Sequence, residues 1–202
     1  MGTPTLGLLT IIGYLCGSIP FGVVVGRIWG FDPRARGSGN IGTTNVARIG
    51  GRIPGIITLG ADVLKGYLPV QLSKLLVGMA PSALAMVALA TFLGSIASIF
   101  LKFRGGRGVA TSLGVWLALA PEPIAIIGLV FATTLLSTRI VSLASLTAAL
   151  VLPPIVAAWN CPPPYILAAI VMTGLVLLRH SENIARLIRG EEPSIMRGGA
   201  RS

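Results

Sequence analysis

The sequence predicts an all-helical membrane protein that crosses the bilayer several times. Only 11% of its 202 residues are charged and the mean hydropathy is +0.86, whereas a soluble domain carries about 25% charged residues. Three long stretches, 1–26, 75–101 and 140–178, contain no charged side chain. The apolar runs are continuous and do not alternate as the strands of a barrel would, so helices are the expected spanning elements. This composition excludes a soluble globule, a disordered chain and a small disulfide-stapled domain.

Seven apolar segments follow one another in what we expect to be a single membrane domain over residues 1–202. A helix needs about 20 apolar residues to cross the hydrocarbon. The first segment meets this length, and the second is interrupted by Asp62 and Lys65, which share a helical face. The third has Pro81 near its outer start. The expected spans are 6–26, 53–72, 75–101, 109–120, 124–138, 140–159 and 165–178.

The fourth and fifth segments are the shortest candidates. They flank Pro121-Glu122-Pro123 and give about 18–23 Å of helix each, which is less than a comfortable span. Two interpretations are open: two short spans, which makes seven in all, or a re-entrant pair, which leaves five full spans.

The positive charges predict the orientation. Fourteen of the sixteen Lys and Arg residues follow the first, third, fifth or seventh segment. Positive charge is retained on the cytoplasmic side of membrane proteins, so we expect the N-terminus outside and the C-terminus in the cytoplasm. The five-span alternative gives the same sidedness.

The first polar cluster lies between the first two segments and is typical of an anion site. Closely spaced glycines allow backbone N–H groups to converge on one point, while hydroxyl, amide and guanidinium donors suit a phosphate. The alternative is a flexible linker. A G-x-G-x-x-G match within the cluster does not indicate a dinucleotide site, because an apolar helix precedes it where a strand is required. The candidate residues are Gly37, Ser38, Gly39, Asn40, Thr43, Asn45 and Arg48.

The second cluster precedes the fourth segment and points to another anion site. Paired glycines between arginines lead directly into a helix, whose N-terminus favours negative charge. The alternative is a basic anchor for lipid headgroups. The candidate residues are Arg104, Gly105, Gly106 and Arg107.

The third cluster ends the seventh segment, where His180 and Asn183 share a helical face and Glu182 lies between them. Lys65, Ser142 and Ser145 are further phosphate-binding candidates. For Lys65 the alternative is a structural ion pair with Asp62, and for the serines it is hydrogen bonding within their own helix. No cluster of acidic, His or Cys residues suits a metal, so we expect neither a metal nor a cofactor.

Five segments of the sequence resemble the bacterial acyl-phosphate:glycerol-3-phosphate acyltransferase family (PlsY-type), in the same order along nearly the whole chain. The resemblance implies an enzyme of the bacterial inner membrane with seven helices and a site facing the cytoplasm. Such an enzyme transfers a fatty acyl group from acyl phosphate to glycerol 3-phosphate, the first committed step of phospholipid synthesis. The matching segments are Gly37–Arg48, Asp62–Pro69, Gly105–Thr111, Val141–Ser145 and His180–Arg186.

The resemblance assigns the core site to Ser38, Arg48, Arg107, His180 and Asn183, with Ser145 and Glu182 as additional members. We expect the two glycine-rich loops to hold the two substrate phosphates. Donors such as Asn183 and Ser38 would stabilise the carbonyl oxygen of the acyl group. His180 acts either as general base or, in the interpretation we favour, as a phosphate ligand, the acyl phosphate itself taking the proton.

Two positions depart from the family pattern. Arg107 stands where the family usually has Lys, and Gly94-Ser95 where it usually has Gly-His. The expected partners are acyl phosphate, glycerol 3-phosphate and membrane lipids, with no nucleic acid. The resemblance also implies the soluble phosphate acyltransferase that draws on acyl carrier protein. An organic-phosphate transporter is the alternative function, since broken glycine-rich helices occur there too.

Overall fold

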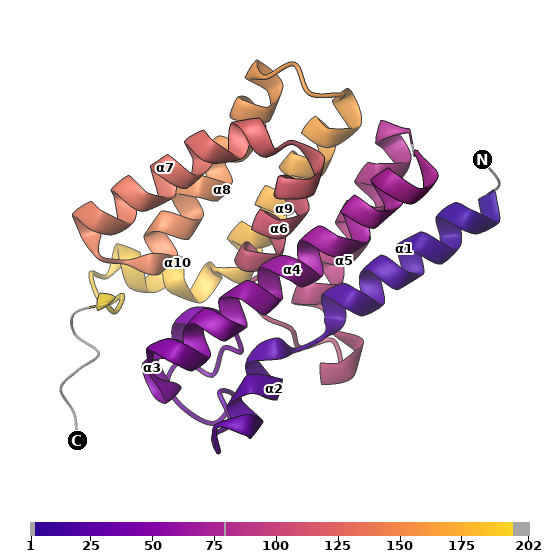
Figure 1. Cartoon of the computed structure of the whole chain (residues 1–202). Coiled ribbons are helices and arrows are strands. Elements are labelled where there is room, and N and C mark those ends of the chain that lie inside the picture. The colour runs from indigo at the N-terminus through magenta and orange to yellow at the C-terminus, as the bar shows by residue number, and fades with distance from the viewer. Residues whose placement is uncertain (1–2, 79, 196–202) are drawn as a thin grey trace. The chain divides into compact units, whose positions relative to one another are not determined.

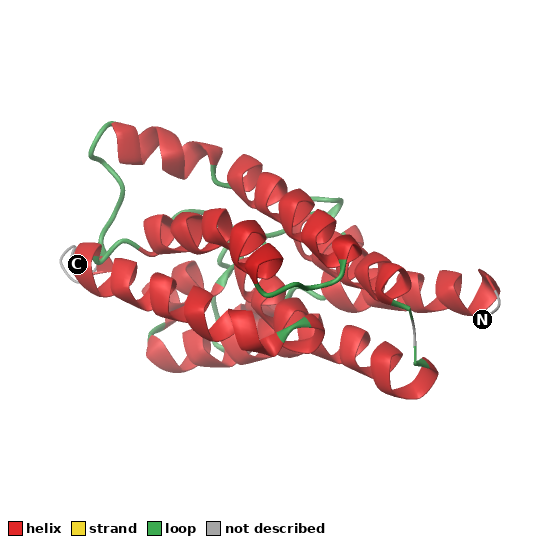
Figure 2. Ribbon diagram, turned by 90° about the horizontal axis from the view of Figure 1, so that it is seen from above, coloured by secondary structure: helices red, strands yellow, loops and turns green. Residues whose placement is uncertain are grey.

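The computed structural model describes residues 3–78 and 80–195, and within these ranges it contains helices and loops but no strand (Figure 2). The predicted all-helical class is therefore confirmed. The chain divides into two compact units, Met1–Leu119 and Ala120–Ser202, which are described separately. The expectation of one domain over 1–202 stays a prediction.

The first unit is built around two helix pairs (Figure 1). Helix α1 packs on α5, α4 packs on α6, and the short α3 lies against α4. Its elements are α1 (Thr3–Ser18), α2 (Phe21–Ile28), α3 (Thr43–Gly50), α4 (Arg52–Val77), α5 (Pro81–Ile96), the 3₁₀ turn η1 (Ile99–Leu101) and α6 (Val109–Leu119).

Glycines bring the paired helices into backbone contact. A Cβ placed on Gly17 would lie 1.9 Å from the Thr91 carbonyl oxygen, so α1 and α5 touch through a position that tolerates no side chain. On the other pair, a Cβ on Gly114 would lie 1.9 Å from Val63 O. Small residues at helix crossings are a general device of membrane proteins, because close van der Waals packing is the available attraction in lipid.

The first predicted span lies within one candidate membrane crossing, Pro4–Ile28, but it is not a continuous helix, because the chain breaks between α1 and α2 at Ile19-Pro20. Proline has no N–H group and cannot continue the hydrogen-bond ladder. The carbonyl of Ile19 instead accepts a hydrogen bond of 2.8 Å from Lys65 Nζ on α4. The second span also differs from the prediction: α4 continues to Val77, and the next helix starts at Pro81.

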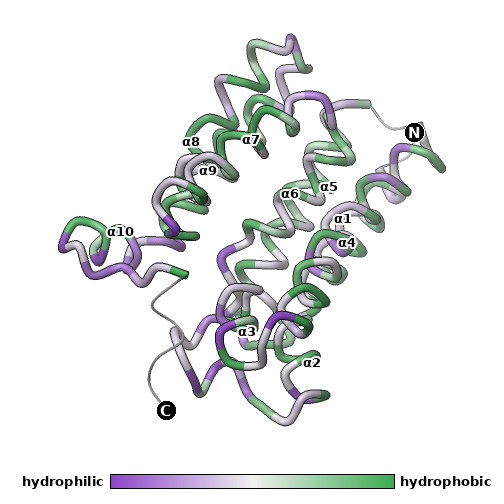
Figure 3. Tube along the Cα trace, turned by 60° about the vertical axis from the view of Figure 1, so that its left-hand side comes forward, coloured by the Kyte–Doolittle hydropathy of each residue, from purple (hydrophilic) through white to green (hydrophobic). Residues whose placement is uncertain are grey.

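The second unit consists of three long helices and one short one. Helix α8 packs against both α7 and α9, while α10 contacts α9. A bend of 62° separates α9 from α10. The elements are α7 (Pro121–Thr138), α8 (Val141–Ala158), α9 (Pro163–Arg179) and α10 (Ser181–Ile188). In Figure 3, hydrophobic residues dominate α7 and α8, whereas hydrophilic residues gather on α10.

Within residues 3–78 and 80–195, four helical stretches are long and apolar enough to cross a membrane, and a fifth is added if the bent pair α9–α10 counts as one span. Helix α4 carries Asp62 and Lys65, and α6 has only 11 residues. The chain is thus a multi-pass membrane protein, while the number of seven spans stays a prediction. The four stretches are Pro4–Ile28, Pro81–Leu101, Pro121–Thr138 and Val141–Ala158.

Candidate functional site

Asn45 organises the first glycine-rich loop. Its side chain is 2% exposed, and its Nδ2 donates to the carbonyl oxygens of Pro33, Arg36 and Asn40 at 2.9, 3.1 and 2.8 Å. Its Oδ1 accepts a hydrogen bond of 2.9 Å from the backbone N–H of Ser38. The structure therefore gives Asn45 a bracing role inside the loop, and its contact with a phosphate stays a prediction.

The loop turns through glycines where side chains do not fit. Gly37 and Gly39 have φ of 62° and 69°, the left-handed region that favours glycine. A Cβ on Gly37 would also lie 2.3 Å from Asn45 Oδ1. Ser38 and Arg48 remain exposed, on the loop and on α3. Their hydroxyl and guanidinium groups are thus accessible to an anion.

The N-terminus of α3 adds a buried hydroxyl to the same loop. Thr43 Oγ1 is buried and has no hydrogen-bond partner among the residues that the structure describes. Just before it, Asn40 Oδ1 accepts from the backbone N–H of Gly42 at 3.2 Å. A buried hydroxyl without a partner costs about 1–3 kcal/mol, so a ligand oxygen here would restore a lost interaction.

The second glycine-rich loop folds back on the end of α5. The N–H of Gly105 donates to Ile96 O at 3.2 Å, and that of Gly106 donates to Ser95 O at 2.9 Å. These two N–H groups thus help to fix the loop, and a contact of Gly105 or Gly106 with phosphate stays a prediction. Ser95 supplies a backbone acceptor here, and its Oγ donates to Phe92 O at 2.6 Å.

The two loops lie side by side within the first unit. A Cβ on Gly106 would lie 3.5 Å from Ile41 Cγ1 and 3.7 Å from Asn40 Oδ1. Arg107 is half-buried next to them, while Arg104 is exposed. The structure therefore brings together the two clusters that the sequence singled out as phosphate sites.

Lys65 lies in a structural network. Its Nζ is 2.7 Å from Asp62 Oδ1 and 5.8 Å from the centre of the Phe21 ring, in addition to its bond to Ile19 O. Lys65 is 8% exposed. The ion pair considered as an alternative is thus present, and a contact of Lys65 with phosphate stays a prediction.

The second unit contains the polar cluster around α10. His180 stands at the bend between α9 and α10, is 2% exposed, and has Nδ1 2.8 Å from Val176 O. A carbonyl oxygen only accepts, so Nδ1 carries a hydrogen and donates it to Val176 O. Asn183, one turn further, is also 2% exposed.

A carboxylate that the sequence interpretation missed completes this cluster. Glu192 accepts hydrogen bonds from Ser142 Oγ and Arg186 Nε, both at 2.7 Å, and from Asn183 Nδ2. Burial raises the pKa of Glu192, but these three hydrogen bonds outweigh it, so the pKa lies below its ordinary value. The sequence did offer one indication of Glu192, because it is one of only six acidic residues in a chain of net charge +10.

Two residues that were predicted to belong to this cluster, Ser145 and Glu182, make other contacts in the structure. Ser145 Oγ donates to Val141 O at 2.9 Å within α8, which is the structural alternative considered for this serine. The side chain of Glu182 is 83% exposed and lies 4.0 Å from the Arg186 guanidinium. A direct role of either residue in the reaction stays a prediction.

Comparisons with known proteins place this geometry in a family. The sequence model described as Glycerol-3-phosphate acyltransferase matches residues 7–190. A glycerol-3-phosphate acyltransferase of Trichlorobacter lovleyi is 47% identical over 191 residues, covering 93% of this chain and 97% of the relative. One of Geobacter sulfurreducens is 45% identical over 185 residues, covering 92% and 95%.

Solved structures agree with the sequence relatives. The crystal structure of PlsY (YgiH), an integral membrane glycerol 3-phosphate acyltransferase, in its glycerol 3-phosphate form is 38% identical with a TM-score of 0.91. It covers 95% of this chain and 96% of that one. The lysphosphatidic acid form of the same protein matches with a TM-score of 0.89, covering 94% and 95%.

Proposed function

Since this chain belongs to the glycerol-3-phosphate acyltransferase family, it is an acyltransferase, and we propose that it moves a fatty acyl group from acyl phosphate to the sn-1 hydroxyl of glycerol 3-phosphate. The products are lysophosphatidic acid and phosphate. An acyl phosphate is a mixed anhydride with a good leaving group, so the reaction needs no covalent intermediate with the protein. The sn-1 oxygen bonds to the acyl carbon, the bond from that carbon to phosphate breaks, and the hydroxyl proton leaves with phosphate.

The observation that carries this proposal is the contact between the two glycine-rich loops of the first unit. Gly106 lies against Ile41 and Asn40, and exposed Ser38 and Arg48 belong to the same loop region. Both substrates bear doubly charged phosphates, and the net charge of +10 favours their approach. We assign the two substrate phosphates to these loops, with Ser38, Arg48 and Arg107 as their side-chain ligands.

His180 serves, in this proposal, to orient a phosphate. With Nδ1 donating to Val176 O, Nε2 donates to a phosphate oxygen when the ring is charged, or accepts the hydroxyl proton when it is neutral. The scarcity of other acids and bases in the candidate clusters favours proton transfer to the acyl phosphate itself.

The substitution His180→Gln separates the two roles, since a glutamine amide donates a hydrogen bond but is not a base. We expect the KM for substrate to rise about tenfold and kcat to fall by less than about a hundredfold, because loss of a general base costs about 10²–10⁴ in rate. A loss of four decades in kcat with unchanged KM would falsify the phosphate-orienting role. Steady-state kinetics in a lipid phase measures both.

We propose that the chain crosses the bacterial inner membrane with seven helices. Its N-terminus lies outside, and its C-terminus lies in the cytoplasm. The charge distribution supports it, with fourteen of sixteen bases on the connections assigned to the cytoplasm. A site on that side is accessible to soluble glycerol 3-phosphate. It is also accessible to acyl phosphate supplied by a soluble phosphate acyltransferase that draws on acyl carrier protein.

The decisive experiment measures lysophosphatidic acid formation and phosphate release by the purified protein. Glycerol 3-phosphate is supplied with palmitoyl phosphate or with palmitoyl-CoA, and Arg48→Ala is compared with the unaltered chain. We expect turnover with acyl phosphate alone and its loss in the variant. Turnover with palmitoyl-CoA would show that the assignment of acyl phosphate as the acyl donor is wrong. If neither donor gives product, the organic-phosphate transporter is favoured, because a transporter makes no lysophosphatidic acid.

A further inference from the structure

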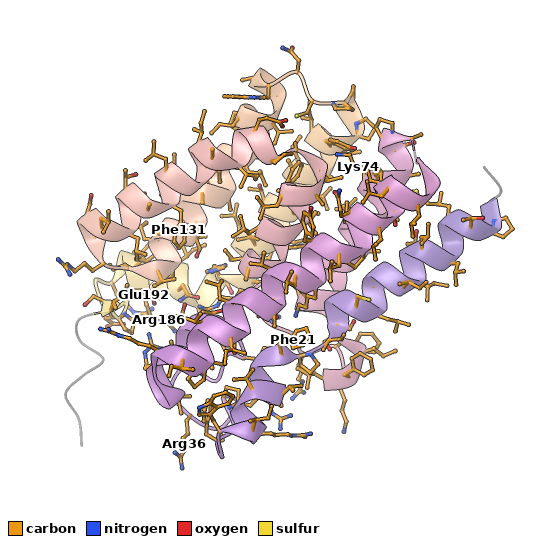
Figure 4. All side chains as sticks on the ribbon, viewed as in Figure 1. Phe21, Arg36, Lys74, Phe131, Arg186 and Glu192 are labelled. Carbon is orange, nitrogen blue, oxygen red and sulfur yellow. The ribbon has the colours of Figure 1, made fainter. Side chains whose placement is uncertain are left out.

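Glu192 lies just beyond the residues that the family model matches, yet its carboxylate accepts hydrogen bonds from three side chains of the second unit. The family match ends at residue 190, and Glu192 follows α10 in the C-terminal segment. Its side chain is only 7% exposed. Oε1 accepts from Ser142 Oγ and Asn183 Nδ2, and Oε2 accepts from Arg186 Nε, next to Glu192 in Figure 4.

This contact determines which way the Asn183 amide points. The pKa of Glu192 lies below its ordinary value, so the carboxylate is ionised at neutral pH and can only accept hydrogen bonds. The amide nitrogen of Asn183 must therefore face Glu192, and the amide oxygen must face the other way.

The amide oxygen is left without a donor. Asn183 Oδ1 is fully buried and has no hydrogen-bond partner within residues 3–78 and 80–195. A buried acceptor of this kind is stabilised when a ligand brings an N–H or O–H group to it. Asn183 is three residues from His180, so this acceptor belongs to the same cluster as the imidazole.

We propose that Glu192 is a positioning residue that holds Asn183 with its Oδ1 turned toward the hydroxyl group to be acylated. The inference rests on the proposed function. While the substrate binds, the alcohol O–H donates to Oδ1, so that the lone pairs of its oxygen are directed toward the acyl carbon. An amide oxygen is not a base, so as the new carbon–oxygen bond forms the proton passes to the departing phosphate. Asn183 thereby acts as an acceptor for the alcohol, in place of the donor to the carbonyl oxygen that the sequence suggested.

A purely structural role for Glu192 is the competing explanation. The C-terminal segment is also attached through the N–H of Ile195, which donates to Arg139 O at 2.8 Å, and the Arg186 ion pair adds to that attachment. A structural brace predicts a lower melting temperature in every variant that loses the ion pair. It does not predict an effect on rate that depends on Asn183.

A double-mutant cycle between Glu192 and Asn183 tests the proposal, with kcat, the KM for each of the two substrates and the melting temperature measured for each folded variant. We expect Glu192→Ala to lower kcat at least about tenfold, with the KM for acyl phosphate unchanged. Glu192→Gln retains an acceptor oxygen for Asn183 and should keep more activity than Glu192→Ala, although both lose the ion pair with Arg186. In the Asn183→Ala background, substitution of Glu192 should cost nothing further.

The matched control is Glu191→Gln, since Glu191 is an exposed neighbour whose carboxylate pairs with Arg189. It should leave kcat unchanged. Additive losses in the cycle, equal activity of Glu192→Gln and Glu192→Ala, or an unchanged kcat would each overturn the proposal. If Glu192→Ala does not fold, the cycle is run with Glu192→Gln, whose smaller loss must also vanish in the Asn183→Ala background. Failure of the unaltered chain to make lysophosphatidic acid refutes the proposed function instead.

Discussion

Two buried side chains, Asn45 and Glu192, each fix a polar cluster by using nearly all of their hydrogen-bonding groups. Asn45 joins three carbonyl oxygens and one N–H of a single loop, whereas Glu192 joins two helices to the C-terminal segment. Polar groups in such networks are costly to leave unpaired. In each cluster, one buried side chain thus holds the neighbouring backbone or side chains in place.

The substitution Asn45→Asp tests the bracing of the first loop. Aspartate keeps the acceptor for Ser38 N–H but donates nothing to the carbonyls of Pro33, Arg36 and Asn40. We expect the free energy of unfolding to fall by about 1–3 kcal/mol, as for buried carbonyls left without donors. Thermal unfolding in detergent measures the loss. Asn40→Asp is the matched control, because its acceptor bond to Gly42 N–H survives; an equal loss there would argue against the brace.

Glu192 makes the protein less stable at acidic pH. Its pKa is lowered in the folded chain, because the hydrogen bonds from Ser142, Asn183 and Arg186 outweigh the opposing effect of burial. The ionised form is therefore favoured by folding, and its stabilisation is present above the ordinary glutamate pKa and lost as the pH falls through the lowered one. We expect the melting temperature to drop less on acidification in Glu192→Gln than in the unaltered chain. An identical drop in both would contradict this linkage.

At the scale of elements, helix crossings through glycine determine how closely α4 and α6 approach. The carbonyl of Val63 occupies the space that a side chain on Gly114 would need. A similar contact joins Gly66 to Thr111 O, where a Cβ would lie 2.2 Å away. Since α6 begins directly after the second glycine-rich loop, this packing also fixes the loop relative to α4.

The variant Gly114→Ala should force α4 and α6 apart. We expect a loss of about 1–3 kcal/mol, the usual cost of overpacking, together with reduced acyltransferase activity. Gly60→Ala, on the same α4, is the control, because no atom lies within 4 Å of the added Cβ. There alanine should stabilise the helix by about 0.5–1 kcal/mol. The two melting temperatures should therefore move in opposite directions, and a shared direction would refute the packing argument.

The sequence predicted the helices better than it predicted the contacts between residues far apart in the chain. Continuous apolar runs predicted where the long helices lie, but not the break at Ile19-Pro20, because apolar residues on both sides hide it. The clusters of the site were predicted from local composition. The partners of Glu192 were not, since Ser142 lies 50 residues away and only the folded chain brings them together.

At the scale of the whole molecule, the short helix α6 determines whether the chain crosses the membrane five or seven times. Its 11 residues give about 16 Å of helix, against about 30 Å of hydrocarbon. However, α6 runs beside α4 from the middle of that helix onward, with Gly114 on Val63 and with Lys74 Nζ donating to Ala118 O at 3.2 Å. The end of α6 is therefore within reach of the Lys74 side chain in the last turn of α4, a helix of 26 residues, so α6 need only complete a crossing that starts at the glycine loop.

This argument predicts that Glu122, which follows α6 near the start of α7, faces the outside. We would replace Cys16 and Cys161 by serine and place a thiol there as Glu122→Cys, because Glu122 is exposed. The native Cys161 is a poor probe, since burial and the charge of Glu122 raise the pKa of its thiol. A membrane-impermeant maleimide should label Glu122→Cys in intact cells, and should label Glu191→Cys in the C-terminal segment only after permeabilisation. Labelling of Glu122→Cys only after permeabilisation would mean that the chain re-enters the cytoplasmic side at this point and crosses five times.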